Sequence, residues 1–253
     1  MPSQPSPAAP LALVLLPFLA LLPPRPVAAT PATAPSGEGL SGAQAKIDPK
    51  WEAAALKKRA AVPTTPGGIV CIGSSHMANW KSVQTDLQPL TVFNMGIGGS
   101  TMAHASEIFI PLMAIPAKPR AILLYEGSND LSAGDAPKTI LEHFRNLYHH
   151  LHRELPETRL YVLGIVPSPG KRFERWEAIQ ETNALLKAEC ASQSWIRFLD
   201  TTSPLIGSDG YPRPECFLIN DPHMTPKGYE SWASVIAPVV VETEKGFESS
   251  KNP

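Results

Sequence analysis

Five short runs of apolar, strand-forming residues recur along the chain, each followed by enough residues for a helix before the next run begins. They occupy residues 69–73, 91–95, 121–126, 159–166 and 195–200. Nearly continuous apolar strands that alternate with helices are typical of a parallel sheet with both faces buried. The pattern therefore predicts an α/β fold, a three-layer α/β/α sandwich around a five-stranded parallel sheet.

Three helices of this sandwich can be placed from their sequence. The segment that starts at Trp51 predicts a short helix on the margin of the fold. Asp135-Ala-Pro137 provides a cap and first turn, and Thr225-Pro226 opens the last helix in the same way. Residues at helical spacing form the inner faces of the latter two helices. They are Ile140, Phe144, Leu147, Leu151 and Leu155 in the helix after Pro137, and Tyr229, Trp232, Ile236 and Val240 in the last helix.

The N-terminus has the pattern of a secretion signal. Residues 11–22 form an apolar run of 12 residues, and Val27 and Ala29 are small residues suited to a signal peptidase. We expect a signal peptide over 1–29, a flexible linker over 30–50, one domain over 51–243 and a tail over 244–253; a disordered proline-rich N-terminal tail is the alternative. The protein is then secreted or periplasmic. A run of this length is too short to span a bilayer as a mature helix, so no integral membrane span is expected in the mature chain.

Charge and cysteine content argue against several classes of protein. Lys+Arg number 22 and Asp+Glu 23, a formal net charge of -1, so no nucleic-acid partner is expected. The 3 cysteines, Cys71, Cys190 and Cys216, lack CxxC spacing and allow at most one disulfide, whose partners stay open. Four histidines off the apolar stripe of their helix indicate a solvated face rather than a metal site; they are His143, His149, His150 and His152.

Polar residues follow several of the predicted strands and precede the last helix. The segments are Gly73-Ser74-Ser75, the loop 94–101, Glu126-Gly127-Ser128-Asn129-Asp130 and the loop 220–226. In a parallel sheet such segments meet at the carboxyl edge, where ligand sites form. Together they offer a serine nucleophile, backbone and amide donors for an oxyanion, and a histidine base.

These four segments resemble the sequence blocks of the SGNH, or GDSL-type, esterases and lipases. Gly73-Ser74-Ser75 resembles the first block, with serine in place of its usual aspartate, and NMGIGGS, GSND and the segment ending at His223 resemble the other three. The resemblance implies a flavodoxin-like SGNH hydrolase fold in which Ser75, and not Ser74, is the nucleophile. It also implies that His223 is the base, that Gly99 and Asn129 are oxyanion-hole residues, and that no cofactor is needed.

One position departs from the family pattern. Asn220 stands three residues before His223, where the family has aspartate, and the nearby carboxylate is Asp221, two residues before. We expect Asn220 to face the histidine ring, where its carbonyl accepts a hydrogen bond but supplies no charge for the imidazolium. The alternative is that Asp221 turns inward, because Pro222 imposes a different backbone geometry.

The resulting hypothesis is a secreted serine esterase that takes a small-molecule carboxylic ester. A short acyl or acetyl group is preferred, and carbohydrate and lysophospholipid esters are both open. The alternatives are a catalytically weakened SGNH-like binding domain, which Asn220 makes credible, and an acyl-thioester hydrolase. Glu126 alone does not provide the carboxylate pair of a glycosidase, and no Gly-x-Ser-x-Gly elbow occurs. The oligomeric state is left open.

Overall fold

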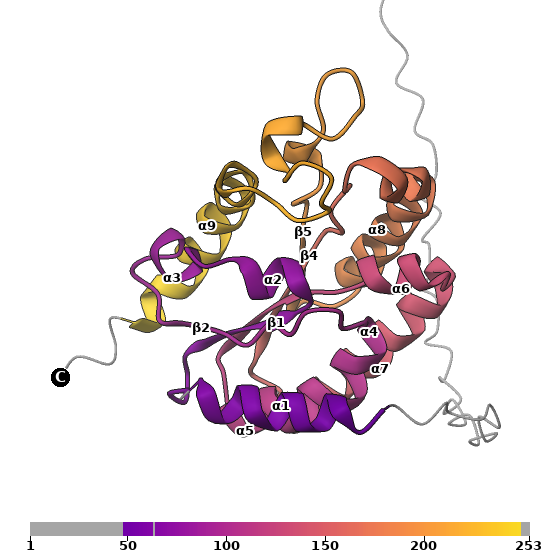
Figure 1. Ribbon diagram of the computed structural model, residues 1–253. Helices are drawn as coiled ribbons and strands as arrows, with labels where there is room; N and C mark the ends of the chain where they lie inside the picture. Colours follow the sequence, from indigo (N-terminus) through magenta and orange to yellow (C-terminus); the bar gives the residue numbers. More distant parts are fainter. Residues whose placement is uncertain (1–47, 63, 249–253) are drawn as a thin grey trace, which may run out of the picture. The chain divides into compact units, whose positions relative to one another are not determined.

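The computed structural model describes residues 48–62 and 64–248 (Figure 1). The predicted signal peptide over 1–29, the linker as far as residue 47 and the last five residues lie outside the described residues. The leader, the linker and secretion therefore stay predictions. The first described helix, α1, spans Lys50–Ala61 and so begins one residue before the expected start of the domain.

A single five-stranded parallel sheet lies at the centre of the domain. Its strand order is β2-β1-β3-β4-β5, and every neighbouring pair is parallel. This is the order of the flavodoxin-like doubly wound fold, so the predicted fold class is confirmed. The strands lie within the five predicted runs: β1 Ile69–Gly73, β2 Val92–Asn94, β3 Ala121–Tyr125, β4 Arg159–Leu163 and β5 Ile196–Leu199.

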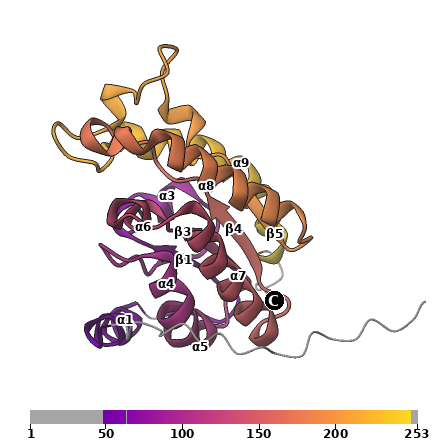
Figure 2. The same cartoon turned by 90° about the vertical axis from the view of Figure 1, so that its right-hand side faces the viewer.

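Helices cover both faces of the sheet, as Figures 1 and 2 show. Alternate residues of each strand enter opposite cores, with Val70 and Ile72 on one face and Ile69 and Cys71 on the other. The first face is covered by α1, α4 Met102–His104, η1 Ala105–Ala114, α5 Ile115–Ala117, α6 Ser128–Ala133, α7 Pro137–Glu154 and α8 Trp176–Ala191. The second is covered by α2 Ser75–Asn79, α3 Val83–Asp86, η3 Ser203–Leu205, η4 Pro214–Cys216 and α9 Pro226–Glu248, while η2 Gly170–Arg175 leads into α8.

On the first face, helix α1 differs from the sequence-based expectation, and helix η1 has an irregular geometry. Helix α1 is part of the core and not only of the margin, because Ala55 is fully buried and the Trp51 ring lies 4.1 Å from the ring of His104. Helix η1 is a ten-residue π-helix with Pro111 inside it. Proline carries no N–H, so it interrupts the regular α-helical hydrogen bonds at that point.

The predicted tail over 244–253 begins too early. Helix α9 continues to Glu248, and the side chain of Glu244 is fully buried. The residues after 243 are mostly polar, which favours a solvated tail when the sequence alone is read. Glu244 is instead buried because Arg120, Arg159 and Tyr161 all donate hydrogen bonds to its carboxylate.

Several features of the described part bear on partners and cofactors. No helix within residues 48–248 is both long and apolar enough to cross a membrane. In the same residues no three His, Cys, Asp or Glu side chains are grouped so that they could hold a metal ion.

His149 packs on Tyr148 and His152 on Trp195, with ring centroids 4.4 Å and 4.6 Å apart. All three cysteines are free and buried.

Candidate active site

Ser75 is the first residue of α2, directly after the end of β1. The chain turns there against β3: a Cβ on Gly73 would lie 2.5 Å from the carbonyl oxygen of Tyr125, so only glycine fits. Ser74 is fully buried at this turn, whereas Ser75 is partly exposed. Of the two serines, Ser75 is therefore the one that a substrate can reach.

Ser75, His223 and Asp221 form a hydrogen-bonded row. Ser75 Oγ lies 2.8 Å from Nε2 of His223. On the other side of the ring, Nδ1 of His223 lies 2.5 Å from Oδ1 of Asp221. A serine, an imidazole and a carboxylate in this order can pass a proton from the hydroxyl to the ring while the carboxylate holds the ring in place.

The expectation that Asn220 faces the ring is wrong. Asn220 is exposed and has a left-handed backbone, with φ of 56°, a conformation that asparagine adopts more easily than most residues. The chain reverses there, and the backbone N–H of Leu218 donates to the carbonyl of His223 at 2.9 Å. This tight reversal brings the residue two before His223, and not the residue three before it, onto the ring.

Asp221 binds the histidine twice through one oxygen. Besides the ring contact, its Oδ1 accepts the backbone N–H of His223 at 2.8 Å. The backbone bond, followed by the ring bond, stabilises the carboxylate and lowers the pKa of Asp221 below its ordinary value. Asp221 is therefore ionised at neutral pH and fixes the orientation of the ring.

One predicted oxyanion residue, Gly99, lies on the loop 94–101, and the other, Asn129, lies in helix α6 and is hydrogen-bonded to that loop. A Cβ on Gly98 would lie 3.7 Å from the Cβ of Ser75; Gly99 follows with φ of 83°, and a Cβ there would lie 3.7 Å from the Trp51 ring. Asn129, near the start of α6, donates from Nδ2 to the carbonyl of Ser100 at 2.8 Å. An amide nitrogen carries two hydrogens, so this bond orients the side chain and leaves the second hydrogen for a ligand.

Two buried carboxyl groups after β3 hold the same loop. Ser100 Oγ donates to Glu126 at 2.6 Å, and Asp130 accepts the backbone N–H of Met102 at 2.9 Å. Burial raises the pKa of Glu126 well above its ordinary value and that of Asp130 to about 6. Nothing in the sequence placed these acids under the loop 94–101, because their partners lie more than twenty residues away.

His76 is a second histidine of the site. It is buried, and its Nε2 donates to the carbonyl of Pro222 at 3.1 Å, an oxygen that also accepts Ser168 Oγ at 3.0 Å. Burial lowers the pKa of His76 to about 3, so the ring is neutral in the working range of pH. Its bond holds the peptide group that joins Pro222 to His223.

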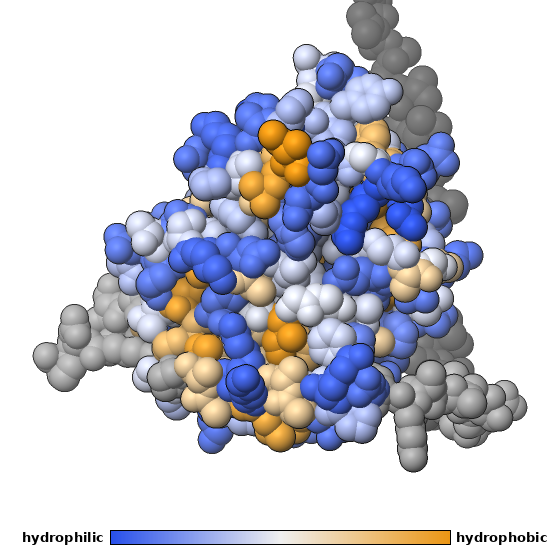
Figure 3. All heavy atoms as spheres, in the orientation of Figure 1, coloured by the Kyte–Doolittle hydropathy of each residue, from blue (hydrophilic) through white to orange (hydrophobic). Residues whose placement is uncertain are grey.

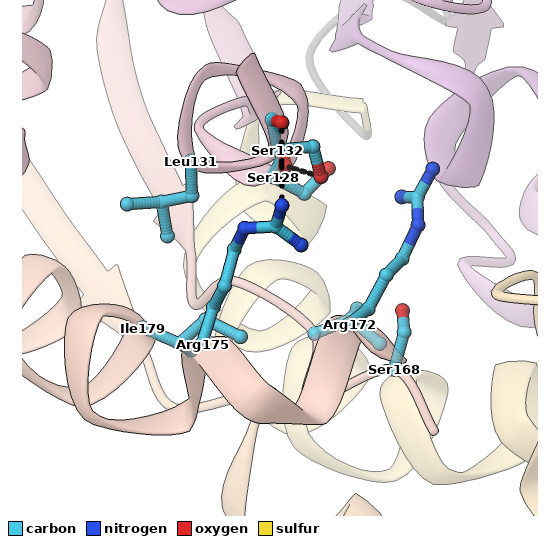
Figure 4. Close-up of a pocket in the computed structure, with 8 residues that line it drawn as sticks. Ser128, Leu131, Ser132, Ser168, Arg172, Arg175 and Ile179 are labelled. Carbon is cyan, nitrogen blue, oxygen red and sulfur yellow. Dashed lines mark hydrogen bonds between the residues drawn. The ribbon is translucent and has the colours of Figure 1, made fainter. Parts of the chain in front are cut away.

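Arg172, on η2, lies between two hollows next to this row. A small pocket with room for about one water molecule is lined by Ser128, Leu131, Ser132, Val166, Ser168, Arg172, Arg175 and Ile179 (Figure 4). A larger hollow of about 390 Å³ lies on the other side and is bounded by residues 169–172 and 220–222. Sequence reasoning did not single out Arg172, because η2 lies outside the four blocks.

A comparison with protein families decides what kind of protein this is. Residues 71–230 match the model of the GDSL-like Lipase/Acylhydrolase family, and this range contains Ser75, Gly99, Asn129, Asp221 and His223. The chain belongs to this family. Its members are hydrolases that act on ester bonds, so the esterase class expected from the sequence is supported at the level of the GDSL family.

Individual relatives of this GDSL family member are distant. The chain is 25% identical over 131 residues to "Platelet-activating factor acetylhydrolase IB subunit alpha2" from Bos taurus, and the match spans 55% of that relative's length. A GDSL-like lipase from Bacteroides thetaiotaomicron superimposes with a TM-score of 0.62 at 16% identity, covering 76% of this chain and 97% of the other. An acetyl esterase crystallised with an acetate ion superimposes with a TM-score of 0.56 at 16% identity, covering 72% of this chain and 99% of the other. At these identities the structural matches support the fold alone.

Proposed function

We propose that this protein is a serine esterase in which Ser75, His223 and Asp221 form the catalytic triad. The observation that carries the proposal is the row of two short contacts, 2.8 Å from Ser75 Oγ to His223 Nε2 and 2.5 Å from His223 Nδ1 to Asp221. The alternative of a binding domain rested on Asn220 in place of an acid. With Asp221 on the ring, that reason no longer applies.

Acylation begins when Ser75 Oγ attacks the ester carbonyl and its proton moves to Nε2 of His223. Asp221 accepts the hydrogen bond from Nδ1 and stabilises the imidazolium that forms. The proton then passes from His223 to the leaving alcohol, and the acyl group stays on Ser75. Water, activated by the same histidine, releases the acid and restores the serine.

The oxyanion of the tetrahedral intermediate needs preorganised donors. The backbone N–H of Ser75, at the first position of α2, has no partner within its own helix. The N–H of Gly99 and the second amide hydrogen of Asn129 are the other donors in this proposal. Removing one donor of this kind costs about 3 kcal/mol of the barrier in other acyl-transfer enzymes.

A short acyl group is the preferred substrate feature. Polar residues outnumber apolar ones among those that line the two hollows beside the row, and the smaller hollow has room for about a single water molecule. A long acyl chain needs a wide apolar channel, which these walls do not provide. The names of the relatives, an acetylhydrolase and an acetyl esterase, point in the same direction.

The decisive experiment combines labelling with turnover. Wild-type protein is incubated with a fluorophosphonate probe, the labelled residue is identified by peptide mapping, and hydrolysis of para-nitrophenyl acetate and octanoate is measured. We expect the label on Ser75 and a higher kcat/KM for the acetate. The Ser75→Ala variant should lose both the label and the turnover.

Ser74→Ala is the matched control, because Ser74 is the neighbouring buried serine. It should keep the label and most of the turnover. Labelling that persists in Ser75→Ala and disappears in Ser74→Ala would reverse the assignment. A folded wild-type protein that takes no label and hydrolyses neither ester contradicts the proposal.

A further inference from the structure

Arg172 is a partly buried arginine that makes no hydrogen bond or ion pair within residues 48–62 and 64–248. Its neighbour on the same short helix behaves differently. Nη2 of Arg175 lies 3.5 Å from the carbonyl of Ser132, and Figure 4 shows the two guanidinium groups diverging, with only that of Arg175 directed at α6. A partly buried guanidinium that lacks a protein partner has donors available for a ligand.

The position of Arg172 connects it to the catalytic row. It borders the hollow of about 390 Å³ together with Asp221 and Pro222, which are in the loop that carries His223. The positive charge of Arg172 also contributes to lowering the pKa of both Asp221 and His76, as expected for a cation close to them. A group bound by Arg172 in this hollow therefore lies next to the reacting centre.

The carboxylate that lines this hollow together with Arg172, that of Asp221, is already hydrogen-bonded. Oδ1 of Asp221 accepts both the ring and the backbone N–H of His223. Lys171, which is exposed and borders the same hollow, adds a second positive charge. Two positively charged side chains therefore line this hollow, together with one carboxylate that is already hydrogen-bonded to His223. Figure 3 shows strongly hydrophilic side chains gathered over the helical turn that leads into α8.

We infer that Arg172 binds an anionic group of the substrate in the hollow beside Asp221. The planar guanidinium fork matches a carboxylate, phosphate or sulfate with two parallel hydrogen bonds. The preferred substrate class is then an ester that carries such a group close to the scissile bond, on its acyl or its alcohol part. This inference rests on the proposed esterase function and adds a charge preference to it.

The test compares anionic and neutral esters that differ only in that charge. On the acyl side, the mono-para-nitrophenyl ester of adipic acid is paired with its methyl-capped counterpart. On the alcohol side, para-acetoxybenzoate is paired with its methyl ester. The measured quantity is the ratio of kcat/KM for the anionic ester to that for the neutral ester, so a general loss of catalysis cancels.

Arg172→Gln should lower this ratio by about tenfold or more in one of the two arms, since a bidentate charged contact is lost. The arm that responds identifies the part of the substrate that carries the anion. Arg172→Lys keeps the charge without the fork and should give an intermediate ratio. Arg175→Gln is the matched control, because it removes a cation from the same helix, and it should change the ratio by less than about twofold.

The possible outcomes separate the inference from the function on which it rests. If the wild type hydrolyses the esters but Arg172→Gln leaves both ratios within about twofold of the wild type, the inference is wrong and the esterase function stands. The same holds if Arg175→Gln lowers the ratio as much as Arg172→Gln does. A wild type that hydrolyses no ester in either arm overturns the function, and the inference with it.

Discussion

Buried carboxyl groups occur at both edges of the sheet, but they differ in how completely their oxygens are hydrogen-bonded. Near the amino ends of β3 and β4, Glu244 is fully buried and accepts four hydrogen bonds from Arg120, Arg159 and Tyr161. At the carboxyl ends, Glu126 and Asp130 are buried too, but each has one oxygen without a partner among the described residues.

The difference shows what each edge does. At the amino edge the charges are paired and connect helix α9 to β4 and to Arg120, the residue before β3. At the carboxyl edge, burial raises the pKa of Glu126 and Asp130, and these acids bind Ser100 of the loop 94–101 and Met102, the first residue of the helix that follows it. Groups held away from their preferred ionisation are common at functional sites. We therefore expect changes at the carboxyl edge to affect mainly turnover, and changes at the amino edge to affect mainly stability.

The largest expected effect is on turnover at the carboxyl edge. Asp221→Asn should lower kcat by about ten-thousandfold, since the ring loses its charged partner and its favoured tautomer. Steady-state kinetics with para-nitrophenyl acetate measures this, and thermal unfolding should show little change. Asn220→Gly is the control, because it removes the side chain but permits the left-handed backbone, and it should cost less than about threefold. A larger loss of kcat in Asn220→Gly than in Asp221→Asn would mean that Asn220, and not Asp221, orients His223.

The second effect is on stability at the amino edge. Glu244→Gln should lower the free energy of unfolding by about 3 kcal/mol, because two arginines lose a buried counter-charge. Urea unfolding measures the loss, and kcat of the folded variant should equal that of the wild type. Glu242→Gln is the matched control on the same helix, since Glu242 is exposed and pairs with Lys245 at the surface. It should cost less than about 1 kcal/mol. Equal losses in the two variants would contradict a special role for the buried carboxylate.

The third effect tests the oxyanion donor. Asn129→Ala should lower kcat by about a hundredfold or more, as expected for the loss of one preorganised donor. The free energy of unfolding should fall by about 1 kcal/mol, for the lost bond to the Ser100 carbonyl. Ser132→Ala, on the same short helix, should leave kcat close to the wild-type value. A kcat in Asn129→Ala equal to that of the wild type would mean that Asn129 only orders the loop.

The smallest effect is the pH dependence of stability caused by Glu126. The pKa of Glu126 is raised in the folded state. At pH values between its ordinary pKa of 4.5 and its folded pKa, Glu126 is ionised in the unfolded chain but still protonated in the folded protein. This carboxyl therefore makes the protein less stable as pH rises through that window. Glu126→Gln is neutral at every pH, so the difference in unfolding free energy between variant and wild type should shift in favour of the variant as pH rises from 4 upward.

Urea unfolding at several pH values between about 4 and 8 measures this difference. Taking the difference between the variant and the wild type cancels the titration of groups that do not interact with Glu126, such as His76. If the difference does not change with pH, Glu126 is ionised in the folded protein, and the comparison between the two edges loses its basis.

The sequence by itself determined the architecture and the segments of the site. Apolar periodicity predicted all five strands, because a strand buried on both faces must be apolar throughout. Turn chemistry and the order of the four blocks predicted that Ser75, the 94–101 loop, Asn129 and His223 lie at one edge, because the carboxyl ends of parallel strands share an edge. These properties depend on local pattern and topology, which a sequence displays directly.

Only the tertiary structure decided which carboxyl groups act where. Asp221 rather than Asn220 faces His223, because the left-handed backbone at Asn220 changes the residue spacing that reaches the ring. Glu244 belongs to the core and not to a tail, because its partners come from β4 and from the residue before β3, 85 and 124 positions away in the chain. Glu126 and Arg172 acquire their roles in the same way, from neighbours distant in sequence. The ionisation state of an acidic or basic side chain depends on the dielectric and on the charged and polar groups around it, and only folding assembles that environment.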